Sequence, residues 1–135
     1  MKIDFLVKGK LSDVFPYFLD LQQYKAVHPL VYQVDQCSEK TFLFYEKLNL
    51  LVYTYRFTYT VLLEQVEDLR KVVMYSEVQK GVHLHLTFTF EEQGDYLLIK
   101  EEVDLKSSFI VKCLFLPFFK RVHLKMFKEI ARRVA

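Results

Sequence analysis

The chain has 135 residues, of which 52% are hydrophobic and 16% aromatic, with 13 Phe, 9 Tyr and no Trp. These values exclude a disordered or low-complexity protein and predict one domain, residues 1–135, that buries about two-thirds of the surface of its unfolded chain. The net charge is +2. The longest apolar run has about eleven residues, whereas a transmembrane helix needs roughly twenty. No integral membrane segment is therefore predicted.

The charge is unevenly distributed along the chain. Residues 106–133 contain eight Lys and Arg residues and the single acid Glu129, a net charge of +7, and the rest of the chain sums to −5. We interpret the basic residues as the water-facing side of a helix, where cations near the C-terminus are favoured by the helix dipole. A transient contact with a membrane surface is a second interpretation, and nucleic-acid binding is not predicted.

The first thirty residues predict one strand and two short helices. Apolar residues alternate over 3–7, which indicates a strand that ends near Gly9. Ser12 is expected to be the N-cap of a short helix that reaches Leu21, with Pro16 in its first turns. A second short helix is expected over 21–28, because Pro29 disfavours helix in the residue before it.

Period-two alternation then predicts six consecutive strands. Their expected ranges are Val31–Cys37, Thr41–Leu48, Val52–Gln65, Lys71–Val78, Val82–Phe90 and Tyr96–Lys106. Turns are expected at 38–40, at Glu67-Asp68, at 79–81 and at 93–95. Ser107-Ser108 should then cap a long helix over Phe109–Val134. Its inner side is expected to carry Phe119, Val122, Met126, Ile130 and Val134.

This order of elements predicts an α+β fold, a curved antiparallel sheet of about seven strands wrapped around the C-terminal helix. The order, the segment from Leu11 to Pro29 and the run Leu116-Pro-Phe-Phe-Lys-Arg resemble the START/Bet v 1-like superfamily, also called SRPBCC or polyketide cyclase/dehydrase-like proteins. The resemblance implies a helix-grip fold and a cavity between sheet and helix. In that superfamily the cavity binds lipids, sterols or polyketides, although fold alone does not decide function.

The candidate ligand-binding residues lie on strands and on the last helix. Tyr53, Tyr55, Phe57 and Tyr59 share one face of a strand, and either a cavity wall or cross-strand packing would explain them. The full set that we expect to contact a ligand is Tyr53, Tyr55, Phe57, Tyr59, Leu86, Phe88, Ile99, Glu101, Phe118 and Val122.

Glu101 is the most informative polar residue, because it interrupts the inward series Leu97, Ile99, Val103 and Leu105. A carboxylate in an apolar cavity can act as a general acid or base. The alternatives are a bulge that turns Glu101 outward, or a partner such as Arg56 or Arg121.

Other polar residues carry weaker signals. His28, beside Pro29 at the expected cavity mouth, is a second candidate acid–base group, and His123 is expected to face water. His83 and His85 could reach one metal from a strand, but no third ligand is evident, so we predict no metal and no cofactor. The lone cysteines Cys37 and Cys113, and an N-terminus without a signal peptide, favour a cytoplasmic protein.

Three functions remain open from the sequence. The preferred one is binding of a hydrophobic or amphipathic small molecule, with Glu101 and tyrosine hydroxyls orienting it. The second is a polyketide cyclase- or dehydratase-like enzyme that uses Glu101, with His28 or Tyr55, as acid–base groups. The third is a protein-interaction module with no ligand, and either a monomer or a homodimer is compatible with all three.

Overall fold

The computed structural model describes residues 1–66 and 70–135. Its elements in chain order are β1 (Lys2–Lys8), α1 (Leu11–Val14), α2 (Pro16–Leu19), α3 (Leu21–Val27), β2 (Val31–Gln36), β3 (Thr41–Asn49), β4 (Thr54–Val66), β5 (Lys71–Gln79), β6 (Val82–Gln93), β7 (Tyr96–Lys106) and α4 (Phe109–Val134). The turn predicted at Glu67-Asp68 lies outside the described residues.

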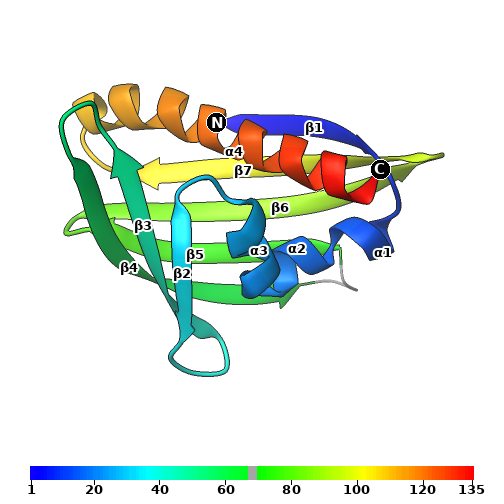
Figure 1. The fold of residues 1–135 in the computed structure, drawn as a ribbon, viewed down its shortest axis with the longest axis horizontal. Coiled ribbons are helices and arrows are strands. Elements are labelled where there is room, and N and C mark those ends of the chain that lie inside the picture. Colours follow the sequence, from blue (N-terminus) through cyan, green and yellow to red (C-terminus); the bar gives the residue numbers. More distant parts are fainter. Residues whose placement is uncertain (67–69) are drawn as a thin grey trace.

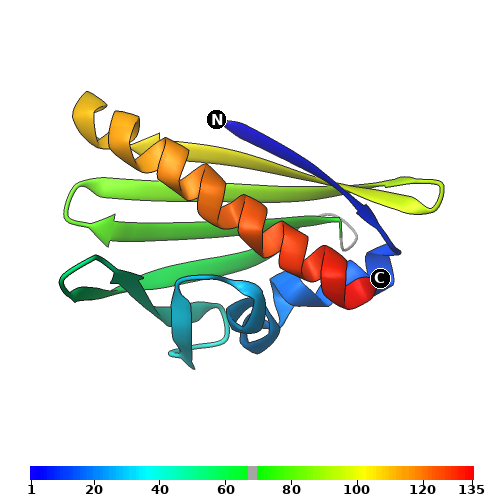
Figure 2. The same ribbon diagram turned by 45° about the horizontal axis from the view of Figure 1, so that its top comes forward.

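The strands form one antiparallel sheet in the order β1-β7-β6-β5-β4-β3-β2, so that β1 and β2 lie at opposite edges. The sheet curves around α4, which crosses its concave face, while α1, α2 and α3 cover the other part of that face (Figure 1, Figure 2). Inward and outward residues alternate along β6 and β7, and the inward residues of the sheet pack against α4 and the short helices. The predicted helix-grip architecture is confirmed.

The first helical segment differs from the prediction. Lys10, not Ser12, is the N-cap of α1, and its side chain makes no capping hydrogen bond. The helix therefore begins two residues earlier than predicted, and its residue Val14 is fully buried. Pro16 begins a separate helix, α2, since proline has no N–H to continue the first one. Asp20 caps α3 by accepting a hydrogen bond from the Gln22 N–H at 3.0 Å.

The core consists of the inner sheet face, the short helices and α4. Phe18 of α2 lies at its centre, with ring centroids 4.9 Å from Phe88 and 5.1 Å from Phe90. The predicted inner side of α4 is buried at Phe119, Val122, Met126 and Ile130, and Phe127 and His123 are buried there as well. Ser108 caps α4 as expected, accepting from the Val111 N–H at 3.3 Å.

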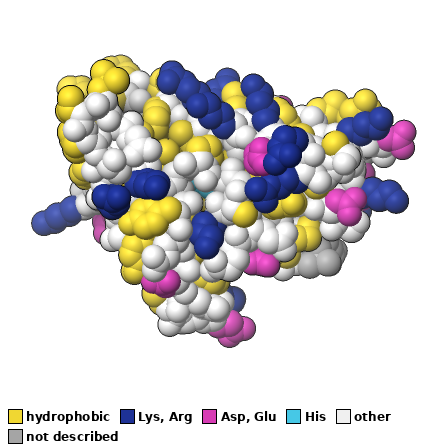
Figure 3. Space-filling model, in the orientation of Figure 1, with side chains coloured by type: hydrophobic (Ala, Val, Ile, Leu, Met, Phe, Trp, Pro, Cys, Tyr) yellow, Lys and Arg dark blue, Asp and Glu magenta, His cyan; other side chains and the backbone are white. Residues whose placement is uncertain are grey.

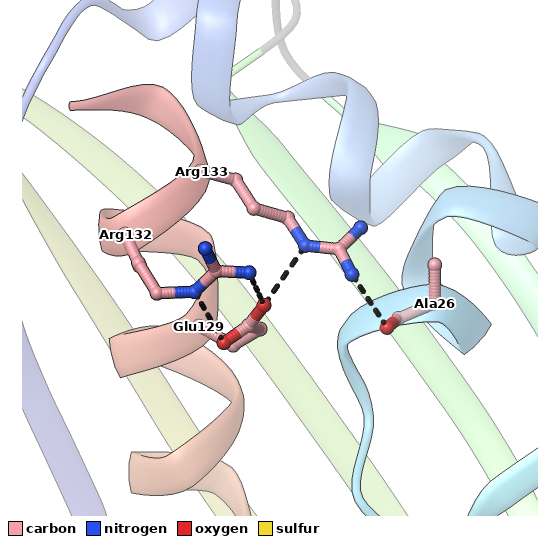
Figure 4. Close-up of polar contacts among 4 residues, drawn as sticks. All are labelled: Ala26, Glu129, Arg132 and Arg133. Carbon is pink, nitrogen blue, oxygen red and sulfur yellow. Dashed lines mark hydrogen bonds and ion pairs between the residues drawn. The ribbon is translucent and has the colours of Figure 1, made fainter.

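The last turns of α4 are attached to α3 by a small polar network (Figure 4). Glu129 accepts hydrogen bonds from the Nε atoms of Arg132 and Arg133, both at 3.0 Å. These bonds, first from Arg132 and then from Arg133, lower the pKa of the Glu129 carboxyl to about 2. Arg133 also donates to the Ala26 carbonyl at 3.3 Å. Part of the basic charge of the C-terminal segment therefore has a structural role.

Candidate functional site

A cavity lies between α4, α3 and the concave face of the sheet. Its walls are mostly apolar, with Phe44, Phe57, Val61, Met74, Val78, Leu84, Leu86, Phe115, Phe118, Phe119 and Val122 among them. The cavity has a volume of about 80 Å³, and the wider atom-free space of about 650 Å³ includes open solvent at its mouth. A histidine is visible in the middle of this face of the molecule (Figure 3). The cavity is therefore narrow, and it is open.

Glu101 and His123 form a buried pair behind one wall of this cavity. Nδ1 of His123 lies 2.8 Å from Oε1 of Glu101, and the side chains are 2% and 0% exposed. The prediction that His123 faces water is wrong, because positions 122, 123, 126, 127 and 130 all lie on the inner side of α4. The sequence suggested Arg56 or Arg121 as a partner of Glu101. The observed partner is His123, which was expected on the water-facing side of α4.

The arrangement of this pair fixes the imidazole of His123. Its ring is stacked on Phe119, one helical turn earlier, with centroids 3.9 Å apart. When Nδ1–H donates to the carboxylate of Glu101, the other ring nitrogen, Nε2, is left as the free acceptor of a neutral imidazole. Since His123 lines the cavity and Glu101 does not, His123 is the member of the pair that a ligand would meet.

His28 also lines the cavity, and the backbone fixes its tautomer. Its Nδ1 accepts hydrogen bonds from the N–H groups of Leu30 at 3.1 Å and Val31 at 3.2 Å, so the neutral ring carries its proton on Nε2. Burial, and secondly the charge of His123, hold the pKa of His28 well below its usual range. The rings of His28 and His123 are 5.5 Å apart and perpendicular. One cavity wall thus combines a fixed N–H donor and a carboxylate-supported imidazole.

A second carboxylate, Glu46 of β3, is buried in the cavity wall and accepts a hydrogen bond from the Tyr59 hydroxyl. Burial raises the pKa of Glu46, although the bond from Tyr59 partly opposes this. Burial also raises the pKa of Tyr24 well above its usual value, and the Glu101 and Glu46 charges add to the effect. Tyr24 and Tyr59 are therefore protonated donors at neutral pH.

Sequence reasoning missed Glu46, although the signal was the one that identified Glu101. Glu46 interrupts the alternating series Phe42, Phe44 and Leu48, just as Glu101 interrupts that of β7. Ser76 is a third interruption, because it faces inward between Met74 and Val78 on β5 and lines the cavity. A polar residue at an inward position of a strand marks the cavity wall at Glu46 and Ser76, and the buried pair behind that wall at Glu101.

The structure separates the ten predicted contact residues into two groups. Phe57, Tyr59, Leu86, Phe118 and Val122 line the cavity, as does His28. Tyr53, Tyr55, Phe88, Ile99 and Glu101 do not. Tyr53 precedes β4, and both Tyr53 and Tyr55 are exposed; Phe88, Ile99 and Glu101 are fully buried in packing. Tyr55, Phe57 and Tyr59 are stacked in sequence, with centroids 5.6 Å and 6.1 Å apart.

The histidines of β6 lie on the convex face. His83 pairs with Glu77 at 3.3 Å, and His85 is stacked on Tyr75 at 4.1 Å. Within residues 1–66 and 70–135, no three His, Cys, Asp or Glu side chains are grouped as metal ligands would be.

None of the helices in those ranges is long and apolar enough to cross a membrane.

Solved structures resemble this chain in fold. One is the di-domain aromatase/cyclase StfQ from the steffimycin biosynthetic pathway (TM-score 0.76, 9% identity, 99% of this chain and 49% of that chain). A second is Ara h 8.0201 (TM-score 0.76, 10% identity, 99% and 95% covered). A third is a START superfamily protein from Mycobacterium smegmatis (TM-score 0.71, 9% identity, 99% and 95% covered).

No protein-family model and no curated protein matches the sequence. The likeness to the solved structures nevertheless shows that the chain has the START/Bet v 1-like helix-grip fold, as its element order indicated. At these identities the likeness concerns fold alone.

Proposed function

We propose that this protein binds a hydrophobic or amphipathic small molecule in the cavity between the sheet and α4. The observation that carries the proposal is an open apolar cavity with convergent polar groups at one wall, which is the usual character of a small-molecule site. The narrow interior favours a flat or slender ligand over a bulky one. Lipid-, sterol- and polyketide-like molecules remain the ligand classes that the fold makes most reasonable.

The polar wall defines how such a ligand would be oriented. His28 offers an N–H donor, Glu46 and the Nε2 atom of His123 offer acceptors, and Tyr24 and Tyr59 contribute hydroxyls close to them. An apolar body with one hydroxyl or carbonyl oxygen would satisfy these groups, whereas a purely aliphatic ligand would leave them unpaired at a cost in free energy. We therefore expect an amphipathic ligand with its polar group against His28 and His123.

The first test is native mass spectrometry of the purified protein, followed by solvent extraction and identification of any released molecule. A fluorescent fatty acid then serves as a probe of the cavity. Ser76→Phe fills the cavity from the inner face of β5, and Thr60→Phe adds the same ring to the convex face as a matched control. We expect Ser76→Phe to weaken probe binding at least about ten-fold, since it occupies the space that the probe needs.

Two results together would reject the proposal. One is a clean apo mass with no thermal shift across a panel of lipids and polyketides. The other is probe binding that Ser76→Phe leaves unchanged in a variant with a wild-type circular dichroism spectrum. Together these results would favour the third hypothesis, a protein-interaction module without a ligand.

The Glu101–His123 pair supports a second candidate function, an enzyme of the cyclase or dehydratase type. A buried carboxylate that orients an imidazole toward a cavity is an arrangement used for proton transfer. In this function His123 would exchange the proton and Glu101 would position it. Once a ligand is known, His123→Asn and Glu101→Gln should abolish turnover while binding persists; a ligand recovered chemically unchanged after incubation would contradict it.

A further inference from the structure

Within residues 1–66 and 70–135, the most exposed apolar side chains are concentrated at one end of the molecule. Among the described residues, the five large apolar side chains with the highest exposed fractions are Leu51 and Val52 (106% and 89%) and Phe109, Ile110 and Leu114 (79%, 70% and 73%). Single exposed apolar residues are common on any surface, but a concentration of them marks an interaction site.

These residues come from two segments that are far apart in sequence. Leu51 and Val52 connect β3 to β4, and the other three belong to the first turns of α4. Both segments lie at the same end of the long axis of the molecule, together with the β5–β6 turn (Figure 1, Figure 2). Hydrophobic side chains gather at that end in the space-filling view (Figure 3). We call Leu50–Tyr53 with Phe109, Ile110 and Leu114 the apolar end.

Local folding does not account for the apolar character of either segment. The Leu50 N–H donates to the Tyr53 carbonyl at 2.8 Å, which leaves Leu51 and Val52 as a two-residue tip. Such tips normally contain Gly, Asn or Asp, because those residues tolerate the turn and the water around it. At the start of α4 the cap is supplied by Ser108, so Phe109 and Ile110 are needed neither for capping nor for packing.

The apolar end continues into the cavity. Tyr55 is stacked on Phe57, which lines the cavity, with ring centroids 5.6 Å apart. On α4, Leu114 is followed by Phe115 and, one turn later, by Phe118, and both of these line the cavity. Aromatic side chains therefore lie between this surface and the cavity on both β4 and α4.

Five exposed basic residues lie near this end, on β3, β4, β7, α4 and the β5–β6 turn. They are Lys47 on β3, Arg56 on β4, Lys80 in the β5–β6 turn, Lys106 at the end of β7 and Lys112 on α4, and all five are exposed. The closest exposed acids are Glu77 and Asp104. Asp104 lies further along β7, and Glu77 is paired with His83 and accepts a hydrogen bond from the Gly81 N–H of the β5–β6 turn. A second copy of the chain docked end to end would oppose the same cations, which disfavours a homodimer.

We propose that the apolar end docks on the surface of a lipid bilayer that contains anionic lipids. Leu51, Val52, Phe109 and Ile110 enter the interface between headgroups and acyl chains, and the surrounding lysines contact the phosphates. The proposal goes beyond ligand binding and does not require a ligand in the cavity. It differs from the membrane contact suggested by the sequence, which would use the basic C-terminal turns of α4. Those turns lie at the opposite end (Figure 1), where Arg132 and Arg133 bind Glu129 and Arg133 also binds the Ala26 carbonyl.

The test is flotation of the full chain with vesicles of phosphatidylcholine alone or with one-third phosphatidylserine. We expect binding to the anionic vesicles, and we expect each lysine near the surface to contribute about five-fold to the partition coefficient. Raising the salt concentration should weaken binding because it screens the phosphates. Leu51→Glu combined with Val52→Glu, and separately Phe109→Glu combined with Ile110→Glu, should each lower partitioning by at least about ten-fold.

The control is Tyr96→Glu, which introduces one glutamate at an exposed aromatic residue at the far end, beside the β6–β7 turn. It should bind vesicles like the wild type. Binding of the fluorescent fatty acid without vesicles separates this proposal from the proposed function, since both double variants should still bind the fatty acid. Three results would each overturn the proposal. They are failure of the wild-type protein to float with anionic vesicles, flotation of the double variants equal to that of the wild type, and a stable wild-type dimer that the double variants dissociate.

Discussion

The buried pair of Glu101 and His123 makes a quantitative prediction about folding stability. The two side chains are joined at 2.8 Å, and His123→Leu leaves the Glu101 carboxylate in the core with no partner. Removing the hydrogen-bond partner of a buried charged group costs about 3–5 kcal/mol, a large part of a total stability of about 5–15 kcal/mol. For a chain of this size the melting temperature should fall by roughly 10–18 °C.

The double variant Glu101→Leu with His123→Leu tests the origin of that cost. It removes both polar groups together, so it should be much more stable than His123→Leu and lie within about 2 kcal/mol of the wild type. Urea unfolding followed by circular dichroism measures all of these variants, because the protein has no Trp to report by fluorescence. His83→Leu is the matched control: its pair with Glu77 is exposed, and its loss should cost at most about 1 kcal/mol.

Two results would refute this reasoning. The first is a cost below about 1 kcal/mol for His123→Leu, since it would mean that the carboxylate is not confined in a dry interior. The second is strict additivity of the two single substitutions in the double variant, which would show that Glu101 and His123 do not interact in the folded protein.

Three further predictions concern pH, capping and packing. Because the pKa of His28 is lowered on folding, the unfolded state binds the proton first, so stability should fall as pH drops below about 6.5, by at most about 1.4 kcal/mol per pH unit. His28→Asn keeps an acceptor for the Leu30 and Val31 N–H groups and should remove this part of the pH dependence. Urea unfolding at pH 7 and pH 5 measures it, and an unchanged loss of unfolding free energy between the two pH values would contradict the prediction. Ser108→Ala should cost about 1 kcal/mol through loss of the α4 cap, whereas Ser107→Ala should be neutral, and equal effects in thermal unfolding would disprove the capping role. Phe18→Ala should cost about 3–5 kcal/mol, because the ring is fully buried among aromatic side chains, and a loss under about 1 kcal/mol would show that this site collapses freely.

The sequence alone determined the seven strands, the long C-terminal helix and their order, although the segment predicted as one helix from Ser12 to Leu21 forms α1 and α2. Period-two alternation and turn residues defined all seven strands to within three residues at either end, and the 3–4 residue spacing of apolar side chains defined α4. These signals are local, because each depends only on which residues share one face of one element. The helix-grip architecture follows from them, since one long amphipathic helix needs one curved apolar sheet face to cover.

Only the tertiary structure decided which polar groups meet. The burial of Glu101 was predictable from its place in an apolar series, but its partner was not, because His123 lies among cations in the sequence and its inward direction depends on how α4 rotates on the sheet. The convergence of His28, Glu46 and Tyr59 on the same cavity likewise requires three elements to be placed relative to one another. Rotation and placement are set by long-range packing, which leaves no periodic signal in the chain.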